Sequence, residues 1–210
     1  VAFDGWSAAT FKAAIADSDM PPGLARAIFP RGGVDLALAY HQRGNDQMRD
    51  ALATTDLGPL RFRDRIAAAV KLRLAQSDPE VVRRGVALFA LPQHAADGTK
   101  AIWGTADAIW AALGDTSDDV NWYTKRASLS AVYGSTVLYW LGDDSAGHQP
   151  TWDFLDRRID NVMSFEKAKA ALRDNPVAKA MMAGPMRLLN LIHAPKTPPE
   201  LPGRSQRSAP

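Results

Sequence analysis

The chain has 210 residues, a formal net charge of +2 and no cysteine. This length suffices for one full hydrophobic core, or for a small unit attached to a larger one. The absence of cysteine excludes disulfides, thiolate metal sites and a cysteine nucleophile. Apolar runs are shorter than the ~18–20 residues that a membrane-spanning helix requires, so no segment is expected to cross a bilayer.

Helical periodicity runs through most of the chain, and neither an alternating strand pattern nor an Asn-Gly hairpin interrupts it. Ser7 is placed to cap the first helix, and Pro79 suits the first turn of another. The pattern predicts an all-α protein. In chain order, the helices predicted before the most distinctive motif run over about 8–17, 23–29, 34–54, 61–76, 79–91 and 100–113.

The next predicted helix, about 121–141, begins with an aromatic pair beside two basic residues. Asp118 and Asp119 precede its first turn, where carboxylates favour the positive end of the helix dipole. Such an aromatic and basic cluster is typical of interface hot spots, although burial under the preceding loop would also explain it. From this pattern alone both interpretations remain open for Asn121, Trp122, Tyr123, Lys125 and Arg126, and the family resemblance described below implies partner presentation.

Apolar and basic side chains separate onto opposite faces of the last predicted helix, 177–193. Lys179 and Arg187 lie on the basic face. This pattern predicts a helix at a membrane interface, although a terminal helix packed on its own bundle would show it too. Residues 194–210, in which five of the last 16 residues are proline, are expected to be disordered. The apolar arc of the helix holds Val177, Met181, Met182, Leu188, Leu189, Leu191 and Ile192.

One long motif resembles a known family. The stretch "GDTSDDVNWYTKRASLSAVYGSTVLYWLGDDS" (114–145), followed by "TWDFLDRRIDNVM" (151–163), is similar to the accessory lipid-binding family of ubiquinone biosynthesis that contains the ninth-numbered coenzyme Q protein. Weaker similarity lies near the start, in "DGWSAATFKAAI" and "LARAIFPRGGVDLALAYH". The resemblance implies a TetR-like helical fold that binds isoprenoid lipid and partners the demethoxyubiquinone hydroxylase, a diiron enzyme.

The resemblance also implies a division of the chain. We expect a degenerate helix-turn-helix region (1–56), a larger lipid-binding and dimerisation domain (57–174), the amphipathic membrane helix (175–193) and the tail (194–210). Apolar residues of the larger domain either fill a solid core or surround a lipid cavity, and the resemblance favours the cavity. The lipid-binding residues are then Trp103, Trp110, Leu129, Val132, Tyr133, Val137 and Trp140.

Two other classes of function are less well supported. A TetR-type transcriptional regulator requires a cationic amino end, but residues 1–56 carry five basic residues against seven aspartates, a net charge of −2. An enzyme requires catalytic or metal-binding groups, yet the four histidines are far apart in sequence and the chain has only three glutamates. We therefore predict no catalytic residue, metal or cofactor.

The resemblance thus implies a lipid-binding accessory protein of ubiquinone biosynthesis that forms a homodimer. Its predicted ligand is an isoprenoid quinone or a phospholipid, and its other partners are the hydroxylase and a membrane surface, without nucleic acid. A signal peptide is not expected in this sequence, and the Ala, Arg and Asp bias is typical of bacteria. The expected place is the bacterial cytoplasm beside the inner membrane, or the matrix side of the mitochondrial inner membrane in a eukaryote.

Overall fold

A computed structural model describes residues 1–174 and 193–195, without the side chains of 165–174. The described chain is helical and contains no strand, which confirms the all-α prediction. Two 3-10 turns, Pro92–His94 and Ala146–His148, join longer helices. The helices are α1 Ala8–Asp17, α2 Pro22–Ile28, α3 Gly33–Thr54, α4 Phe62–Ala75, α5 Pro79–Phe89, α6 Ala95–Ala112, α7 Val120–Trp140 and α8 Gln149–Asp174.

Short polar side chains start several helices, as the sequence predicts. The Ser7 hydroxyl accepts from the Thr10 backbone nitrogen at 3.2 Å at the start of α1. Asp119 caps α7 by accepting from the Asn121 backbone nitrogen at 2.8 Å. Because these caps satisfy backbone donors that have no helical partner, they fix where each helix begins.

The start of α6 differs from its prediction. The helix begins at Ala95 rather than near residue 100. Its first turns contain Gly98, where an added Cβ would lie only 2.7 Å from the Phe89 Cβ. A glycine is therefore needed for α5 and α6 to approach closely, but in the sequence it weakens the helical pattern.

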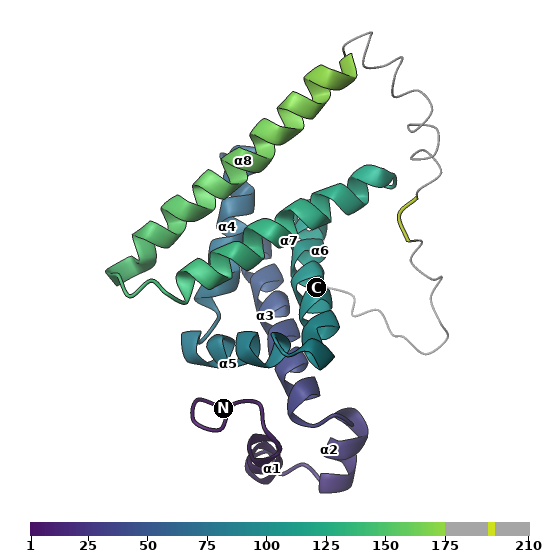
Figure 1. Cartoon of the computed structure of the whole chain (residues 1–210), viewed down its shortest axis with the longest axis vertical. Coiled ribbons are helices and arrows are strands. Elements are labelled where there is room, and N and C mark those ends of the chain that lie inside the picture. The colour runs from purple at the N-terminus through teal and green to yellow at the C-terminus, as the bar shows by residue number, and fades with distance from the viewer. Residues whose placement is uncertain (175–192, 196–210) are drawn as a thin grey trace.

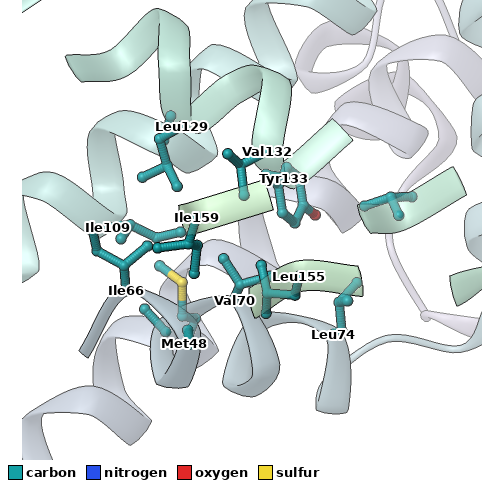
Figure 2. Close-up of a cluster of buried hydrophobic side chains, with 14 of the residues drawn as sticks. Met48, Ile66, Val70, Leu74, Ile109, Leu129, Val132, Tyr133, Leu155 and Ile159 are labelled. Atoms are coloured by element: carbon teal, nitrogen blue, oxygen red, sulfur yellow. The ribbon is translucent and has the colours of Figure 1, made fainter. Parts of the chain in front are cut away.

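Helices α3, α4, α6, α7 and α8 surround the core, with α6 packed against both α3 and α7 (Figure 1). Helix α8 runs across α7 and α4, while α1 and α2 lie at the far end of α3 (Figure 1). Side chains of α3, α4, α6, α7 and α8 meet in one buried cluster (Figure 2). Its most enclosed apolar members include Met48, Val70, Leu74, Ile109 and Leu155.

Helix α3 links the two regions expected on either side of residue 56. It starts beside α1, and its second half contributes Met48 and Leu52 to the core of the larger domain. Within the described residues, no helix is both long and apolar enough to cross a membrane. Except for residues 193–195, the predicted membrane helix and tail lie outside the described part of the chain.

Candidate functional site

A cavity of about 410 Å³ lies between α3, α4, α5, α6 and α7. We call it the lipid cavity, after the ligand expected from the sequence. Apolar side chains dominate its wall, and its size falls in the ~300–1,000 Å³ range typical of small-molecule sites. The apolar side chains of its wall include Trp6, Leu74, Val81, Val82, Val86, Phe89, Ile102, Val137 and Leu138.

Helix α5 covers one side of the lipid cavity. Its apolar face lines the cavity, yet none of its residues is fully buried. Two arginines connect it to neighbouring backbone: Arg83 donates to the Leu141 carbonyl at 2.7 Å, and Arg84 donates to the Ala2 carbonyl at 2.9 Å. Helix α5, the cover of the cavity, is thus held by side-chain hydrogen bonds to the end of α7 and to the amino-terminal segment.

Arg73 of α4 forms a polar corner in the otherwise apolar wall. It is only 2% exposed, and its guanidinium donates to the Asn45 side-chain oxygen at 2.8 Å, the Ser77 hydroxyl at 2.8 Å and the His41 carbonyl at 3.0 Å. All of these acceptors are neutral. Among the described residues, no carboxylate forms an ion pair with Arg73, so its charge is not neutralised within that part of the chain.

His41 lies beside Arg73 at the same corner. Its Nε2 lies 3.0 Å from the Ala101 carbonyl and 2.8 Å from the Thr105 hydroxyl, which donates to Asn45. Burial, together with the positive charge of Arg73, lowers the pKa of His41 to about 4. The imidazole is therefore neutral at pH 7, with Nε2 as the donor and Nδ1 facing Arg73.

The predicted lipid-binding residues separate into three groups. Tyr133 and Val137 line the lipid cavity. A second pocket of about 240 Å³ lies between α4, α6, α7 and α8. Trp110, Leu129 and Val132 line that second pocket rather than the lipid cavity.

Trp103 and Trp140 line neither of these two hollows, and their part in lipid binding stays a prediction. The Trp103 ring lies 5.9 Å from the Trp122 ring, between centroids, at the start of α7. Trp140 is buried, with its ring 6.0 Å from the His148 ring. Apolar spacing places both side chains inward, but it does not distinguish a packed interior from a cavity wall.

The first turn of α7 and the facing part of α6 carry a surface that we call the display patch, formed by Trp103, Asn121, Trp122, Tyr123 and Lys125. The Trp122 and Tyr123 rings meet edge to face at 4.8 Å. Asn121 is exposed, whereas the other four side chains are partly exposed. The aromatic pair is therefore neither buried core nor free surface, which is the setting expected of an interface anchor.

An ion-pair network lies beneath the display patch. The buried Asp115 carboxylate accepts from Lys125 Nζ at 2.7 Å and from the Arg126 guanidinium at 2.9 Å. Burial raises the pKa of Asp115, but hydrogen bonds from Lys125, Arg126 and Ser117 outweigh it and lower the pKa to about 2. Asp115 is thus ionised at neutral pH and ties the start of α7 to the loop after α6.

Arg126 is placed differently from the prediction that groups it with the exposed residues of the patch. It is 3% exposed, donates to Asp107 at 2.6 Å, and its guanidinium lies 4.0 Å from the centre of the Trp122 ring. Two carboxylates draw it inward, so Trp122 lies over a fixed cation. Arg126 supports the display patch from below, and partner binding by the patch stays a prediction.

The chain returns to the display patch at residues 193–195. The Tyr123 hydroxyl donates to the His193 carbonyl at 3.2 Å, and the Ala194 backbone nitrogen donates to the Asp118 carbonyl at 2.7 Å. Residues 193–195 therefore lie at the edge of this surface.

Sequence reasoning missed the polar corner and the cover. The spacing of the histidines gives no sign that His41 is buried, and Arg73 lies in a helix rich in exposed basic residues. One signal was present: Arg73 follows Ile66 and Val70 at spacings of seven and three, which places it within ~60° of them on a helical wheel. An arginine among core positions of a helix indicates a buried polar group that requires partners.

Comparison with known proteins identifies the family. The COQ9 family model matches residues 95–166, which include α6, α7 and the start of α8. The ubiquinone biosynthesis protein COQ9-B, mitochondrial, of Xenopus laevis is 30% identical over 202 residues, covering 89% of this chain and 67% of that protein. The chain belongs to the COQ9 family.

Two further COQ9 relatives, both named as mitochondrial ubiquinone biosynthesis proteins, show the same pattern. The Drosophila melanogaster protein is 33% identical over 151 residues, 69% of this chain and 46% of that protein. The human protein is 28% identical over 201 residues, 89% of this chain and 62% of that protein. The chain thus spans about half to two thirds of the COQ9 proteins that it matches.

A solved structure has a similar fold. A TetR transcriptional regulator from Nitrosomonas europaea superposes with a TM-score of 0.57 over 71% of this chain and 83% of that one, at 17% identity. This likeness confirms the TetR-like fold predicted for the COQ9 chain and carries no information about DNA binding. Within the described residues, no group of three His, Asp or Glu side chains is arranged to hold a metal ion.

Proposed function

We propose that this chain acts in ubiquinone biosynthesis as a lipid-binding accessory protein. It holds a prenylated quinone intermediate in the lipid cavity and presents it, at a membrane, to a demethoxyubiquinone hydroxylase. Membership of the COQ9 family supports the pathway. The observation that carries the binding function is the lipid cavity itself, an apolar hollow of about 410 Å³ under a single amphipathic helix.

Filling the cavity tests this function. Gly134 lines the lipid cavity, and an added Cβ would lie 3.7 Å from Ile102 Cδ1, an ordinary contact. Gly134→Leu therefore places a side chain in the hollow without displacing backbone. The matched control is Gly104→Leu, because an added Cβ at Gly104 of α6 meets nothing within 4 Å.

The measurement is native mass spectrometry of the purified chain, followed by lipid extraction. We expect wild type and Gly104→Leu to retain an isoprenoid or phospholipid and Gly134→Leu to retain much less. Equal retention by all three proteins, or no lipid in any of them, would contradict the proposal.

Presentation to the hydroxylase is assigned to the display patch. Its aromatic residues are partly exposed, and a fixed cation lies beneath Trp122. Tyrosine and tryptophan combined with arginine are enriched at interface hot spots. The hydroxylase is therefore the protein partner that we propose for this surface.

Membrane association is assigned to residues 177–193, most of which lie outside the described part of the chain. The proposal rests on the sequence alone: each Leu or Met removed from water contributes ~1.5–3 kcal/mol, and each basic residue adds ~1 kcal/mol near an anionic surface. Replacing Leu188 and Leu189 with Asp is expected to abolish flotation with anionic liposomes. Flotation of the double variant, or none by wild type, would contradict this assignment.

The proposed place of action is the inner membrane, on the cytoplasmic side in a bacterium or the matrix side in a mitochondrion. The relatives named above are mitochondrial proteins by name. A homodimer is part of the proposal, and nucleic acid is not, because the net charge of −2 on residues 1–56 opposes binding to phosphates. A gel-shift assay at low salt tests the last point, since a shifted band would contradict it.

A further inference from the structure

A short stretch of chain from far along the sequence lies against the display patch. Residues 193–195, which we call the strap, are placed beside the start of α7 (Figure 1), and His193 is 70 positions after the residue that it contacts, Tyr123. Ala194 is partly buried, whereas His193 and Pro195 are exposed. The strap therefore rests on the patch with its middle residue and presents its two ends to solvent.

A single peptide group makes both hydrogen bonds between the strap and the patch. The His193 carbonyl accepts from the Tyr123 hydroxyl at 3.2 Å. The N–H of the same peptide group, which belongs to Ala194, donates to the Asp118 carbonyl at 2.7 Å. The C=O and N–H of a planar trans peptide point in opposite directions. The peptide thus bridges the tip of the Tyr123 side chain and the backbone just before α7.

Tyr123 belongs to a set of three aromatic rings in the display patch. The centre of its ring lies 4.8 Å from that of Trp122 and 6.5 Å from that of Trp103. Within the described residues, the His193 carbonyl is the only hydrogen-bond partner of the Tyr123 hydroxyl. A tyrosine buried at an interface usually finds a hydrogen-bond partner for its O–H. A protein that binds this hydroxyl must therefore take the place of the strap.

The strap is held weakly enough to be displaced. Both of its hydrogen bonds join neutral groups. A hydrogen bond of this kind shifts an equilibrium by a factor of about two to ten. The strap can therefore cover the edge of the display patch in the free chain and still give way to a partner that contacts the three rings.

We infer that the strap is an autoinhibitory contact, in which residues 193–195 compete with the partner protein for the edge of the display patch. The apparent affinity of the partner is then reduced in proportion to the fraction of chains in which the strap is released. This inference rests on the proposed function, because it takes the hydroxylase as the partner, and it adds regulation of the surface that binds it.

The first test weakens the strap without altering the patch. Ala194→Pro removes the backbone N–H that donates to Asp118. We expect isothermal titration calorimetry of the full chain to show two- to tenfold tighter binding to the hydroxylase. Ala194→Ser is the matched control, because it changes the side chain but keeps the N–H, and its affinity should equal that of wild type.

The second test fixes the strap on the patch. The chain has no cysteine, so Asp118→Cys combined with Ala194→Cys offers one possible bridge within the molecule. A disulfide joins α-carbons roughly 4.4–6.8 Å apart, which is a separation compatible with the hydrogen bond between these two residues. After oxidation, free thiols are alkylated, and intact mass and thermal unfolding confirm a bridged, folded chain. We expect the bridged form to bind the hydroxylase at least tenfold more weakly than the same protein after reduction. Each single cysteine variant, treated identically, should bind like wild type.

The outcomes separate this inference from the proposed function. No binding of the hydroxylase by wild type, by Ala194→Pro or by the reduced pair overturns the proposed partner, and the inference with it. Equal binding by the bridged and reduced forms overturns the strap alone, and so does failure of the two cysteines to form a bridge. Weaker binding by Ala194→Pro would show that the strap is part of the interface and would also overturn the inference. If the double variant does not fold, Ala194→Pro alone decides.

Discussion

Arg73 and Arg126 are buried to nearly the same extent, 2% and 3% exposed, yet they sit in opposite electrostatic environments. Arg126 pairs with Asp107 and Asp115 beneath the display patch. Arg73 has only neutral oxygens and nitrogens around it at the wall of the lipid cavity. Arg126 with its two carboxylates fixes a surface, whereas Arg73 is held only by neutral hydrogen-bond partners among the described residues.

The comparison separates two kinds of buried arginine within one bundle. Asp115 joins the loop after α6 to the first turn of α7, so the paired charges hold the display patch in position. The cavity is held by apolar packing, and its polar corner keeps a charge for which the described protein supplies no counterion. Burial alone therefore does not distinguish these two arginines; the identity of their hydrogen-bond partners does.

The largest expected difference is in the free energy of unfolding, between the variants that lack Arg126 and Arg73. Arg126→Met leaves buried Asp115 with only Lys125 as its cation, so we expect a loss of ~3–5 kcal/mol in the free energy of unfolding. Arg73→Met leaves neutral groups without a donor, which costs ~1–2 kcal/mol. Urea denaturation of both variants measures the two values, and equal losses would contradict the distinction between the two sites.

Acid should destabilise the two regions in different pH ranges. His41, with a pKa lowered from 6.5 to about 4, stays neutral in the folded protein while the unfolded chain binds a proton. Stability from this group is therefore lost as pH falls from ~6.5 to ~4, by ~2–3 kcal/mol. Asp115, with a pKa lowered from 3.8 to about 2, contributes stability that is lost only as pH falls from ~3.8 towards 2.

The substitution His41→Gln separates these two ranges. We expect it to flatten the loss of unfolding free energy between pH 6.5 and 4, because glutamine does not titrate, and to leave the steeper loss below pH 4. Hydrogen bonds from Ser145 and Thr151 lower the pKa of Asp143 to about 2, so protonation of this carboxylate adds to the loss of stability below pH 4. An unchanged profile above pH 4 in the variant would show that His41 is not the titrating group.

Truncation at the display patch should affect binding more than folding. Trp122→Ala is expected to weaken binding to the hydroxylase by ~2 kcal/mol, because the ring is an aromatic anchor that rests on Arg126. Its effect on the melting temperature should be small, since the side chain is already partly exposed. Isothermal titration calorimetry and thermal denaturation provide the two readings.

Tyr139→Ala is the matched control for Trp122→Ala. Tyr139 is an exposed aromatic at the other end of α7 and stacks on Phe154, outside the display patch. We expect its removal to leave the hydroxylase affinity unchanged. A melting temperature that falls sharply in Trp122→Ala, with affinity intact, would show that Trp122 serves only the fold.

The smallest predicted effects concern two glycines of α6. An alanine at Gly104 meets no neighbour and should stabilise the helix by up to ~1 kcal/mol. At Gly98, beside the cavity cover, the Cβ of an alanine would lie 2.7 Å from the Phe89 Cβ. Gly98→Ala should therefore lower the free energy of unfolding by ~1 kcal/mol or more. Opposite signs in thermal unfolding confirm that α5 is packed closely on α6, and equal signs contradict it.

Much of the fold could be predicted from local chemistry. Ser7 and Asp119 start helices because their side chains satisfy backbone donors, and this depends on neighbours in sequence only. The start of α6 could not be predicted in the same way. Its first turns depend on contact between Gly98 and Phe89, which belongs to tertiary packing.

The candidate site was predictable at the surface and less so inside. The motif around Trp122 indicated a patch because aromatic and basic residues are adjacent in the chain. The interior required knowledge of which helices face one another: Tyr133 and Trp140 have the same apolar spacing, yet only Tyr133 reaches the cavity. The environment of Arg73 also depends on α3 residues nearly thirty positions away, such as Asn45, which sequence spacing does not reveal.

The attachment of α5 has a consequence for the rate of ligand exchange. Arg83 and Arg84 hold this helix by hydrogen bonds to the carbonyls of Leu141 and Ala2, and the helix has no fully buried residue of its own. Movement of α5 away from α6 therefore breaks these two hydrogen bonds and the close contact between Phe89 and Gly98 but opens no fully buried residue of α5, so an occupant could leave without unfolding of the core. For the proposed ligand, residence time would then depend on the two arginines on the outside of α5, and affinity on groups on the inside. Substitution of either arginine should accelerate both entry and release and leave the equilibrium constant nearly unchanged.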